Sequence, residues 1–222
     1  MYPTAALGVI YDFKNMKQKF FGGGKTEFKK LKQKDESKEG HTDDVTALCV
    51  SHSRKLVASG QNGSKPIIFL WDAETAEVKG KHRLPKGGRL VTAIGISATD
   101  KYVCASDAAE QVTCYVFKVG TVAPIHSITI NYKVAHLAWS PHTEEVFATA
   151  GKDHMIVCQP KGDNYEKKTG KQKGASQSMC SVAWAVDPAK KDDLFTGGAD
   201  GKIYHWTNDT LNKTYDNNKK SI

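Results

Sequence analysis

The amino-acid sequence predicts an all-β fold of the β-propeller type. Four segments that alternate apolar and polar residues recur along the chain, and their starts are separated by 46, 43 and 45 residues. Each segment is followed by two further short strand-like runs with polar turns between them. No stretch of useful length has the period of an amphipathic helix. Short strands repeated at this interval are typical of propeller blades, which stack because one blade cannot bury both faces of its sheet.

The expected strands follow from this repeat in order. The recurring first strands are VTALCVS, VTAIGIS, VAHLAWS and MCSVAWA, which begin at residues 45, 91, 134 and 179. Second strands are expected at KLVASG, KYVCAS, EVFATAG and DLFTGG, and third strands at IIFLWDA, VTCYVFKV, HMIVCQP and KIYHWTN. Weaker fourth strands are expected around 77–84, 125–130 and 212–215.

The repeats divide the chain into six parts. Residues 1–23 are expected to supply strands of a preceding propeller element, and residues 24–39 a lysine-rich insertion. Blades are expected at 40–85, 86–124, 125–170 and 171–222, the last including a tail. About four blades are too few to close a ring that usually has about seven. We therefore expect an open arc with incomplete terminal blades, and a partial or truncated propeller that is one part of a longer protein.

Particular residues in these blades resemble the WD repeat. Gly40-His41 precedes the first blade, and Trp71-Asp72 closes its third strand. In WD repeats a His, a Ser or Thr, an Asp and a Trp form a hydrogen-bonded chain between loop and strands. The resemblance implies structural roles for His41, Ser59, Trp71, Asp72, Thr149, Asp153, Thr196, Asp200 and Trp206. The sets are degenerate, because the second blade has Phe117 in place of Trp and the third offers Cys158 or Gln159.

A closer resemblance rests on the order of less common features. LGVIYDFKNMKQKFFGG, GHTDDVTALCVS and LVASGQNGSKPIIFLWDAET together resemble the first propeller of the echinoderm microtubule-associated protein-like family. EVFATAGKDHMIVCQPKGDNYEKKTGKQKG is also similar to that family, which has a basic loop there. The resemblance covers about residues 7–207 and implies binding to tubulin or microtubules. It implies a cytoplasmic place on the cytoskeleton, including that of a cilium or flagellum. The GGKTEFKKLKQKDESKE insertion before His41 departs from the family pattern.

The positive charge is concentrated in two lysine-rich tracts. The net charge is +8, yet residues 14–38 hold nine lysines against three acidic residues, and residues 161–173 hold five against two. The tracts are either solvated loops or a contact surface for an acidic partner, such as a polyanion, an anionic membrane face or an acidic protein. As partner-binding candidates we select Lys25, Lys29, Lys30, Lys32, Lys34, Lys167, Lys168, Lys171 and Lys173.

Several function classes are excluded by the sequence. No apolar run has the length of about 20 residues that a membrane-spanning helix needs. The five cysteines are odd in number and form no Cys-x-x-Cys pair, which argues against a disulfide framework or zinc cluster and favours a reducing, cytosolic setting. GGGKT at 22–26 lacks the first glycine of a phosphate-binding loop, and no Gly-x-Ser-x-Gly elbow is present. We therefore expect no enzyme, no cofactor and no metal.

Two functions from different classes remain. The first is a non-enzymatic microtubule-associated propeller that binds tubulin or microtubules and acts as a scaffold. The alternative is a general WD-repeat scaffold that recruits another protein and has no cytoskeletal role. Nucleic-acid binding is the weaker third hypothesis, because the lysine-rich tracts accompany no recognised reader module.

Overall fold

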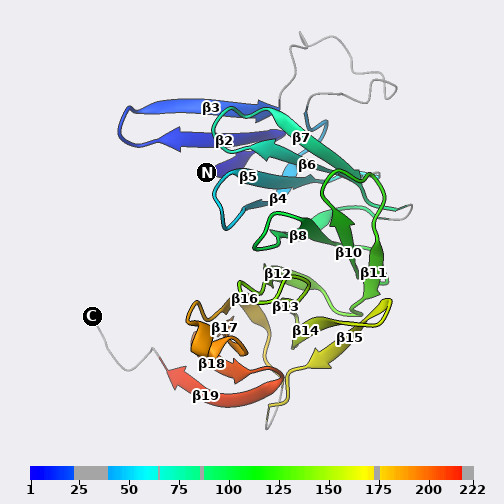
Figure 1. The fold of residues 1–222 in the computed structure, drawn as a ribbon, viewed down its shortest axis with the longest axis vertical. Coiled ribbons are helices and arrows are strands. Elements are labelled where there is room, and N and C mark those ends of the chain that lie inside the picture. The colour runs from blue at the N-terminus through cyan, green and yellow to red at the C-terminus, as the bar shows by residue number, and fades with distance from the viewer. Residues whose placement is uncertain (23–39, 65, 86–87, 173–175, 217–222) are drawn as a thin grey trace.

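A computed structural model of the chain describes residues 1–22, 40–64, 66–85, 88–172 and 176–216. Within these ranges the strands form five antiparallel sheets that follow one another around an open arc (Figure 1). No α-helix occurs in this part of the chain, which contains one short 3-10 turn at Pro188–Lys190. The predicted all-β propeller architecture and the open arc are therefore confirmed.

The sheets are consecutive in sequence. The N-terminal sheet has three strands, β1 (Tyr2–Thr4), β2 (Leu7–Asp12) and β3 (Lys17–Gly22). The next two sheets contain β4 (Val45–Val50), β5 (Leu56–Gln61), β6 (Ile67–Asp72) and β7 (Val78–Arg83), then β8 (Val91–Ile96), β9 (Tyr102–Asp107), β10 (Thr113–Lys118) and β11 (His126–Thr129). The last two contain β12 (Val134–Trp139), β13 (Phe147–Gly151), β14 (His154–Lys161) and β15 (Asn164–Thr169), then β16 (Met179–Trp184), β17 (Asp193–Gly198), β18 (Lys202–Thr207) and β19 (Thr210–Asp216).

The outermost strands correct three of the expectations. Strand β11 pairs with β10, so the expected blade boundary at 124/125 is wrong and the second four-stranded sheet extends to Thr129. Strand β15 occupies residues that were expected to form a basic loop. The β4–β7 and β16–β19 sheets both have four strands, so the blades expected to be incomplete are complete. An outer strand at a solvated edge needs little apolar alternation, which is why its sequence signal is weak.

The hydrophobic core lies between the sheets. Among the described residues, four clusters of buried apolar side chains each combine residues from two neighbouring sheets. At the N-terminal end, Phe21 of β3 stacks on Trp71 of β6 with ring centroids 4.7 Å apart and an interplanar angle of 9°. Each sheet is thus stabilised mainly by burying a face against the next one.

Hydrogen bonds at the inner ends of the blades join consecutive sheets. Two indole N–H groups donate to backbone oxygens of the preceding sheet, Trp139 to Gly95 at 3.0 Å and Trp184 to Ala138 at 2.9 Å. Side chains in the turns make similar links between neighbours, namely Ser53 to Asp100 at 2.5 Å, Ser97 to Glu144 at 2.9 Å and His142 to the Ala185 oxygen at 2.9 Å. These directional bonds fix how far each sheet is rotated from the last.

Close approach between two sheets requires a glycine at position 60. A Cβ placed on Gly60 of β5 would lie 2.5 Å from Cγ1 of Val91, which is fully buried at the start of β8. By contrast, a Cβ on Gly80 of β7 would meet Leu70 at an ordinary 3.4 Å. The first two four-stranded sheets therefore pack too tightly for any side chain at position 60.

Replacing Gly60 by alanine tests this packing. Gly60→Ala is expected to lower the free energy of unfolding by about 1–3 kcal/mol, because Val91 must leave its rotamer or the sheets must separate. Gly80→Ala is the matched control, and it is expected to be neutral or stabilising by up to about 1 kcal/mol, because alanine is less flexible than glycine in a strand. Urea denaturation of both variants measures the difference. Equal losses would contradict tight packing at position 60.

Candidate interaction surface

Trp71 begins a chain of hydrogen bonds that crosses the β4–β7 sheet. Its Nε1–H donates to Ser59 Oγ at 3.0 Å, and that oxygen lies 2.7 Å from His41 Nε2. His41 Nδ1 lies 2.9 Å from Gln61 Oε1, an atom that can only accept, so Nδ1 carries the proton. Ser59 therefore donates to the unprotonated Nε2. Gln61 Nε2 donates onward to Thr42 Oγ1 at 3.1 Å, so every bond in the chain has one direction.

Burial keeps His41 in the neutral form that this chain needs. The residue is 5% exposed, and desolvation lowers its pKa to about 4, although the hydrogen bond to Gln61 acts in the opposite direction. A neutral imidazole has one donor and one acceptor nitrogen, which matches Gln61 on one side and Ser59 on the other. His41 is thus used for structure and is not available as an acid or base near neutral pH.

The β16–β19 sheet contains a shorter version of the chain. Trp206 Nε1 donates to Thr196 Oγ1 at 2.9 Å, and Thr196 donates to Met179 Sδ at 3.2 Å. Met179 thus ends the chain where the β4–β7 sheet has a histidine. Asp200 lies outside it, accepting from the Tyr204 hydroxyl at 2.8 Å and from the backbone N–H of Lys202 at 3.2 Å. The implied link from Asp200 to the Trp–Thr pair is therefore wrong.

The β8–β11 and β12–β15 sheets have other residues at the positions equivalent to Ser59 and Trp71. Strand register places Ala105 and Phe117 of the β8–β11 sheet where Ser59 and Trp71 stand, so an apolar pair replaces the hydrogen-bonded one. In the β12–β15 sheet Cys158 takes the tryptophan position. There Thr149 lies 3.4 Å from Nε2 of the buried His154.

The remaining predicted aspartates stabilise turns. Asp72 accepts from the backbone N–H groups of Glu74 and Thr75 at 2.9 and 2.8 Å. Asp153 accepts from the Ser178 hydroxyl at 3.1 Å and has a positive φ of 57°, a conformation that aspartate tolerates better than most residues. Neither side chain joins a tryptophan to a serine or threonine.

Three residues in these networks were missed by the sequence analysis, namely Gln61, Met179 and His154. Gln61 pairs with Val45 at the start of the recurring first-strand segment, so the repeat alignment could have located it. The alignment could not identify its role, because Gln61 aligns with Gly198, two residues before Asp200, and the WD pattern assigns no role to an amide there. Met179 is likewise a member of the recurring segment, but a thioether is a weak acceptor and gives no sequence signal.

Residues 23–38 of the first lysine-rich tract lie outside the described residues. This applies to Lys25, Lys29, Lys30, Lys32 and Lys34, and to Lys173 of the second tract.

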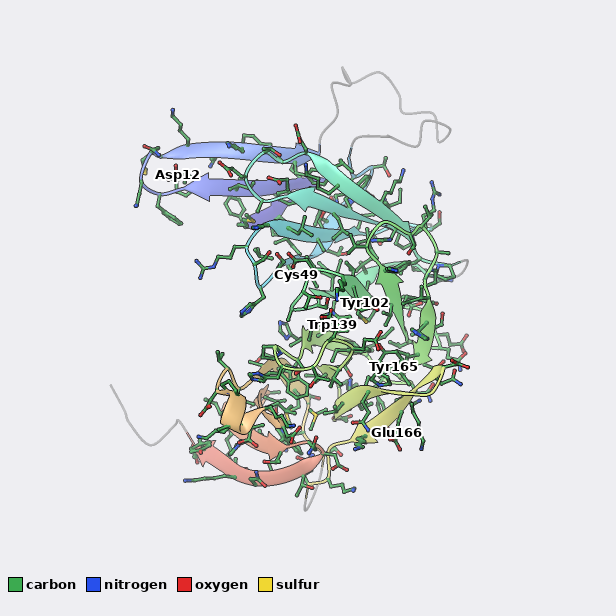
Figure 2. All side chains as sticks on the ribbon, viewed as in Figure 1. Asp12, Cys49, Tyr102, Trp139, Tyr165 and Glu166 are labelled. Atoms are coloured by element: carbon green, nitrogen blue, oxygen red, sulfur yellow. The ribbon has the colours of Figure 1, made fainter. Side chains whose placement is uncertain are left out.

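The second tract is largely engaged within the chain. Lys167 and Lys168 lie on strand β15, the outer strand that carries Tyr165 and Glu166 in Figure 2. Lys167 Nζ donates to the backbone oxygen of Thr129 at 2.6 Å, and Lys171 pairs with Asp209 at 2.8 Å. The Lys168 side chain makes no hydrogen bond or ion pair with a described residue, although its backbone lies in the β14–β15 ladder. Lys167 thus contacts the preceding sheet and Lys171 the following one, so the structure does not gather these lysines on one face.

Other candidate chemistry is limited in the part of the chain that the structure describes. No group of three or more His, Cys, Asp or Glu residues there is arranged to hold a metal ion. Burial raises the pKa of the Cys104 and Cys158 thiols, which opposes the thiolate that a nucleophilic cysteine needs. None of the described segments is a helix long and apolar enough to cross a membrane.

Comparisons with known proteins agree with the fold. The family model for the WD domain, G-beta repeat, matches residues 33–72. The β-propeller domain of Cps50 (Swd1) from Myceliophteria thermophila superposes with a TM-score of 0.64 over 77% of this chain and 54% of that one, at 14% sequence identity. At that identity the likeness shows the fold alone. The WD-repeat β-propeller is thereby confirmed.

Curated relatives extend the similarity over most of the chain. The ciliary WD repeat-containing protein ctxp80 of Euplotoides octocarinatus is 41% identical over 221 residues, which are 97% of this chain and 30% of that protein. Echinoderm microtubule-associated protein-like 1 of Rattus norvegicus is 25% identical over 79% of this chain and 23% of its own length. Echinoderm microtubule-associated protein-like 3 of Homo sapiens is 26% identical over 75% of this chain and 20% of its own length. The resemblance to that family is confirmed, and the chain spans less than a third of each relative.

A double-mutant cycle tests the Trp–Thr pair of the β16–β19 sheet. Thr196→Ala leaves the buried Trp206 N–H without an acceptor and is expected to cost about 1–3 kcal/mol of unfolding free energy. Adding Trp206→Phe reproduces the Ala105–Phe117 pair and is expected to recover part of that loss, so the two effects are not additive. Denaturant titration of the wild type, both single variants and the double variant gives the coupling. Strict additivity would show that the hydrogen bond contributes little.

The depressed pKa of His41 predicts acid sensitivity. The folded state binds a proton at His41 only near pH 4, whereas the unfolded chain binds it near pH 6.5, so unfolding takes up a proton between these values. The stabilisation is complete above about pH 6.5 and is lost as the pH falls toward 4, by up to about 3 kcal/mol. His82, His136 and His154 shift in the same direction. His41→Gln is therefore expected to flatten, but not abolish, the slope of unfolding free energy between pH 7 and 5, and an unchanged slope would contradict it.

Proposed function

We propose that this chain, whose WD repeats form consecutive propeller blades, is a non-enzymatic scaffold module that binds tubulin or microtubules. The observation that carries the proposal is the 41% identity to a ciliary WD repeat-containing protein over 97% of the chain. Similarity to microtubule-associated relatives over more than three quarters of the chain supports the same partner. On this proposal the protein works in the cytoplasm on the cytoskeleton, including the microtubules of a cilium or flagellum.

The use of polar residues in the blades supports binding over catalysis. His41, which could act as an acid or base, is buried and takes part in a hydrogen-bonded chain that joins strands. Thr196 is buried in the same way against Trp206. Because these residues serve the fold, the exposed turns at the ends of the strands are the surface available for binding other proteins.

The charge distribution supports an acidic protein surface as the partner. Residues 14–38 carry a net charge of +6, from nine lysines and three acidic residues. We propose that the main contact is made by Lys25, Lys29, Lys30, Lys32 and Lys34, with a smaller contribution from Lys167, Lys168, Lys171 and Lys173. The second set is ranked lower because Lys167 and Lys171 already have partners within the chain.

Charge reversal of the first tract tests the function. Changing Lys25, Lys29, Lys30, Lys32 and Lys34 to Glu is expected to weaken co-sedimentation with polymerised tubulin by at least about tenfold, since exposed charge pairs contribute about 0.2–1 kcal/mol each. Wild-type binding is expected to fall steeply as salt rises, because such charges are screened over about 8 Å at physiological ionic strength. Circular dichroism is expected to show the same β content in both proteins.

A matched control separates a local contact from bulk charge. The control reverses five exposed lysines elsewhere, Lys79, Lys101, Lys118, Lys190 and Lys191. It is expected to retain most of the binding. If both variants lose microtubule binding equally, the loss comes from the change in net charge and not from a local contact. If wild-type chain fails to co-sediment at low salt, the microtubule proposal is wrong, and a general WD-repeat scaffold without a cytoskeletal role takes its place.

A further inference from the structure

A cleft of about 620 Å³ lies between the N-terminal sheet and its neighbour. Its walls are the β2–β3 hairpin on one side and the turns β4–β5 and β6–β7 on the other. Figure 2 shows Asp12, which lines the cleft, at the far end of the hairpin, away from Trp139 in the middle of the arc. The cleft includes Lys17 and Lys19 from the start of the first lysine-rich tract, but none of the nine lysines selected above as partner-binding candidates.

Four cationic side chains line this cleft. Lys17 and Lys19 alternate along β3 with the same orientation as Phe21, which packs on Trp71, so they face the β4–β7 sheet. Arg54 and Lys55 come from the opposite wall. All four are exposed, and none forms an ion pair with a described residue. These four cations outnumber by one the carboxylates that line the same cleft, which belong to Asp12, Asp72 and Glu74, so its lining carries a small positive excess.

The opposite wall is fixed in place by hydrogen bonds. The Arg54 N–H donates to the Ser51 oxygen at 2.9 Å, and Arg54 has a φ of 60°, the left-handed conformation of a tight turn. Ser53 binds Asp100 of the next sheet, and the Lys55 oxygen accepts from the Ala73 N–H at 2.8 Å. A turn tied to two other segments presents its side chains at a defined site, which lowers the entropy lost on binding.

Two of the three carboxylates of the cleft, those of Asp12 and Asp72, stabilise turns. Asp12 accepts from the backbone N–H groups of Lys14 and Asn15 at 2.9 and 3.3 Å and from the Asn15 side chain at 2.7 Å. Asp72 caps the β6–β7 turn. Glu74 contributes its backbone oxygen, which accepts from Lys19 at 2.7 Å. Among the described residues, none of the three carboxylates forms an ion pair with the four cations, which can therefore contact carboxylates of a partner.

Apolar groups complete the surface. Ile10 and Ala73, both half-buried, line the cleft between the charges. Phe13 and Met16, in the turn that ends the hairpin, are 81% and 72% exposed. A phosphate polymer would gain nothing from these apolar groups, and a flat lipid surface does not fill a concave cleft. A peptide that carries both carboxylates and an apolar side chain complements both features.

We propose that this cleft binds an acidic peptide segment of a partner protein, with Arg54, Lys55, Lys17 and Lys19 contacting its carboxylates. The proposal deepens the proposed function, because it rests on an acidic protein being the partner. It adds a contact site on described strands and turns, which uses Lys17 and Lys19 at the start of the first lysine-rich tract and none of the nine lysines selected above.

Peptide binding to the whole chain tests the cleft directly. The probe is a short fluorescein-labelled peptide rich in glutamate with one leucine at its centre, followed by fluorescence anisotropy. Arg54→Gln/Lys55→Gln and Lys17→Gln/Lys19→Gln are each expected to weaken binding by about tenfold, since two exposed charge pairs are lost in each. The control Lys190→Gln/Lys191→Gln removes two exposed charges far along the chain and is expected to bind like the wild type.

Three outcomes would overturn the proposal. Equal binding by both cleft variants and the control places the peptide elsewhere, and failure of the wild type to bind removes the site. If inorganic polyphosphate or anionic vesicles bind as tightly as the peptide and depend equally on Arg54 and Lys55, the occupant is wrong. Thermal melting identifies any variant that has lost its fold. If one of the two double variants is unfolded, peptide binding by the other tests the cleft. Peptide binding without microtubule co-sedimentation would support the cleft and reject only tubulin as the partner, whereas the reverse result would reject the cleft alone.

Discussion

The burial of sheet faces against neighbouring sheets is the constraint on which this structure depends. Within the described residues the apolar clusters lie between sheets and not within them, as the stacking of Phe21 on Trp71 illustrates. The sheets must also approach closely enough that a side chain at Gly60 would collide with Val91. Hydrogen bonds such as Trp139 to Gly95 then set the angle between sheets that apolar contact alone would leave adjustable. The outward-facing turns are free to carry charge because they contribute little to this packing.

The sequence predicted the features that this packing imposes at regular intervals. The recurring first strands, such as Val45–Val50 and Val91–Ile96, face neighbours on both sides and so carry a strong apolar pattern. Outer strands were expected around 77–84, 125–130 and 212–215 and are present. The outer strand Asn164–Thr169 was missed, because one edge meets solvent and lysines are tolerated there. The fold could therefore be read from the inner strands, while the limits of each sheet could not.

Residue roles were less predictable than strands. Ser59 and Trp71 were identified, but their partner Gln61 was not, because the atom that accepts from His41 can belong to an amide or a carboxylate. The lysine count located positive charge along the chain without showing that Lys171 is paired with Asp209. Nor could spacing place Lys19 opposite Arg54, since those two residues are brought together only when the N-terminal sheet packs on the next one.

The blades use either a polar or an apolar pair of residues at two equivalent positions, which affects how the sequences of such repeats can diverge. Thr196 with Trp206 and Ala105 with Phe117 each form a satisfied pair, one polar and one apolar. A single substitution in either pair leaves a buried N–H without an acceptor or a hydroxyl among apolar groups, and both intermediates are less stable than the end points. Selection for folding therefore favours joint replacement of the two residues. Among descendants of one ancestral blade, these positions are expected to co-vary, while the exposed turns drift independently.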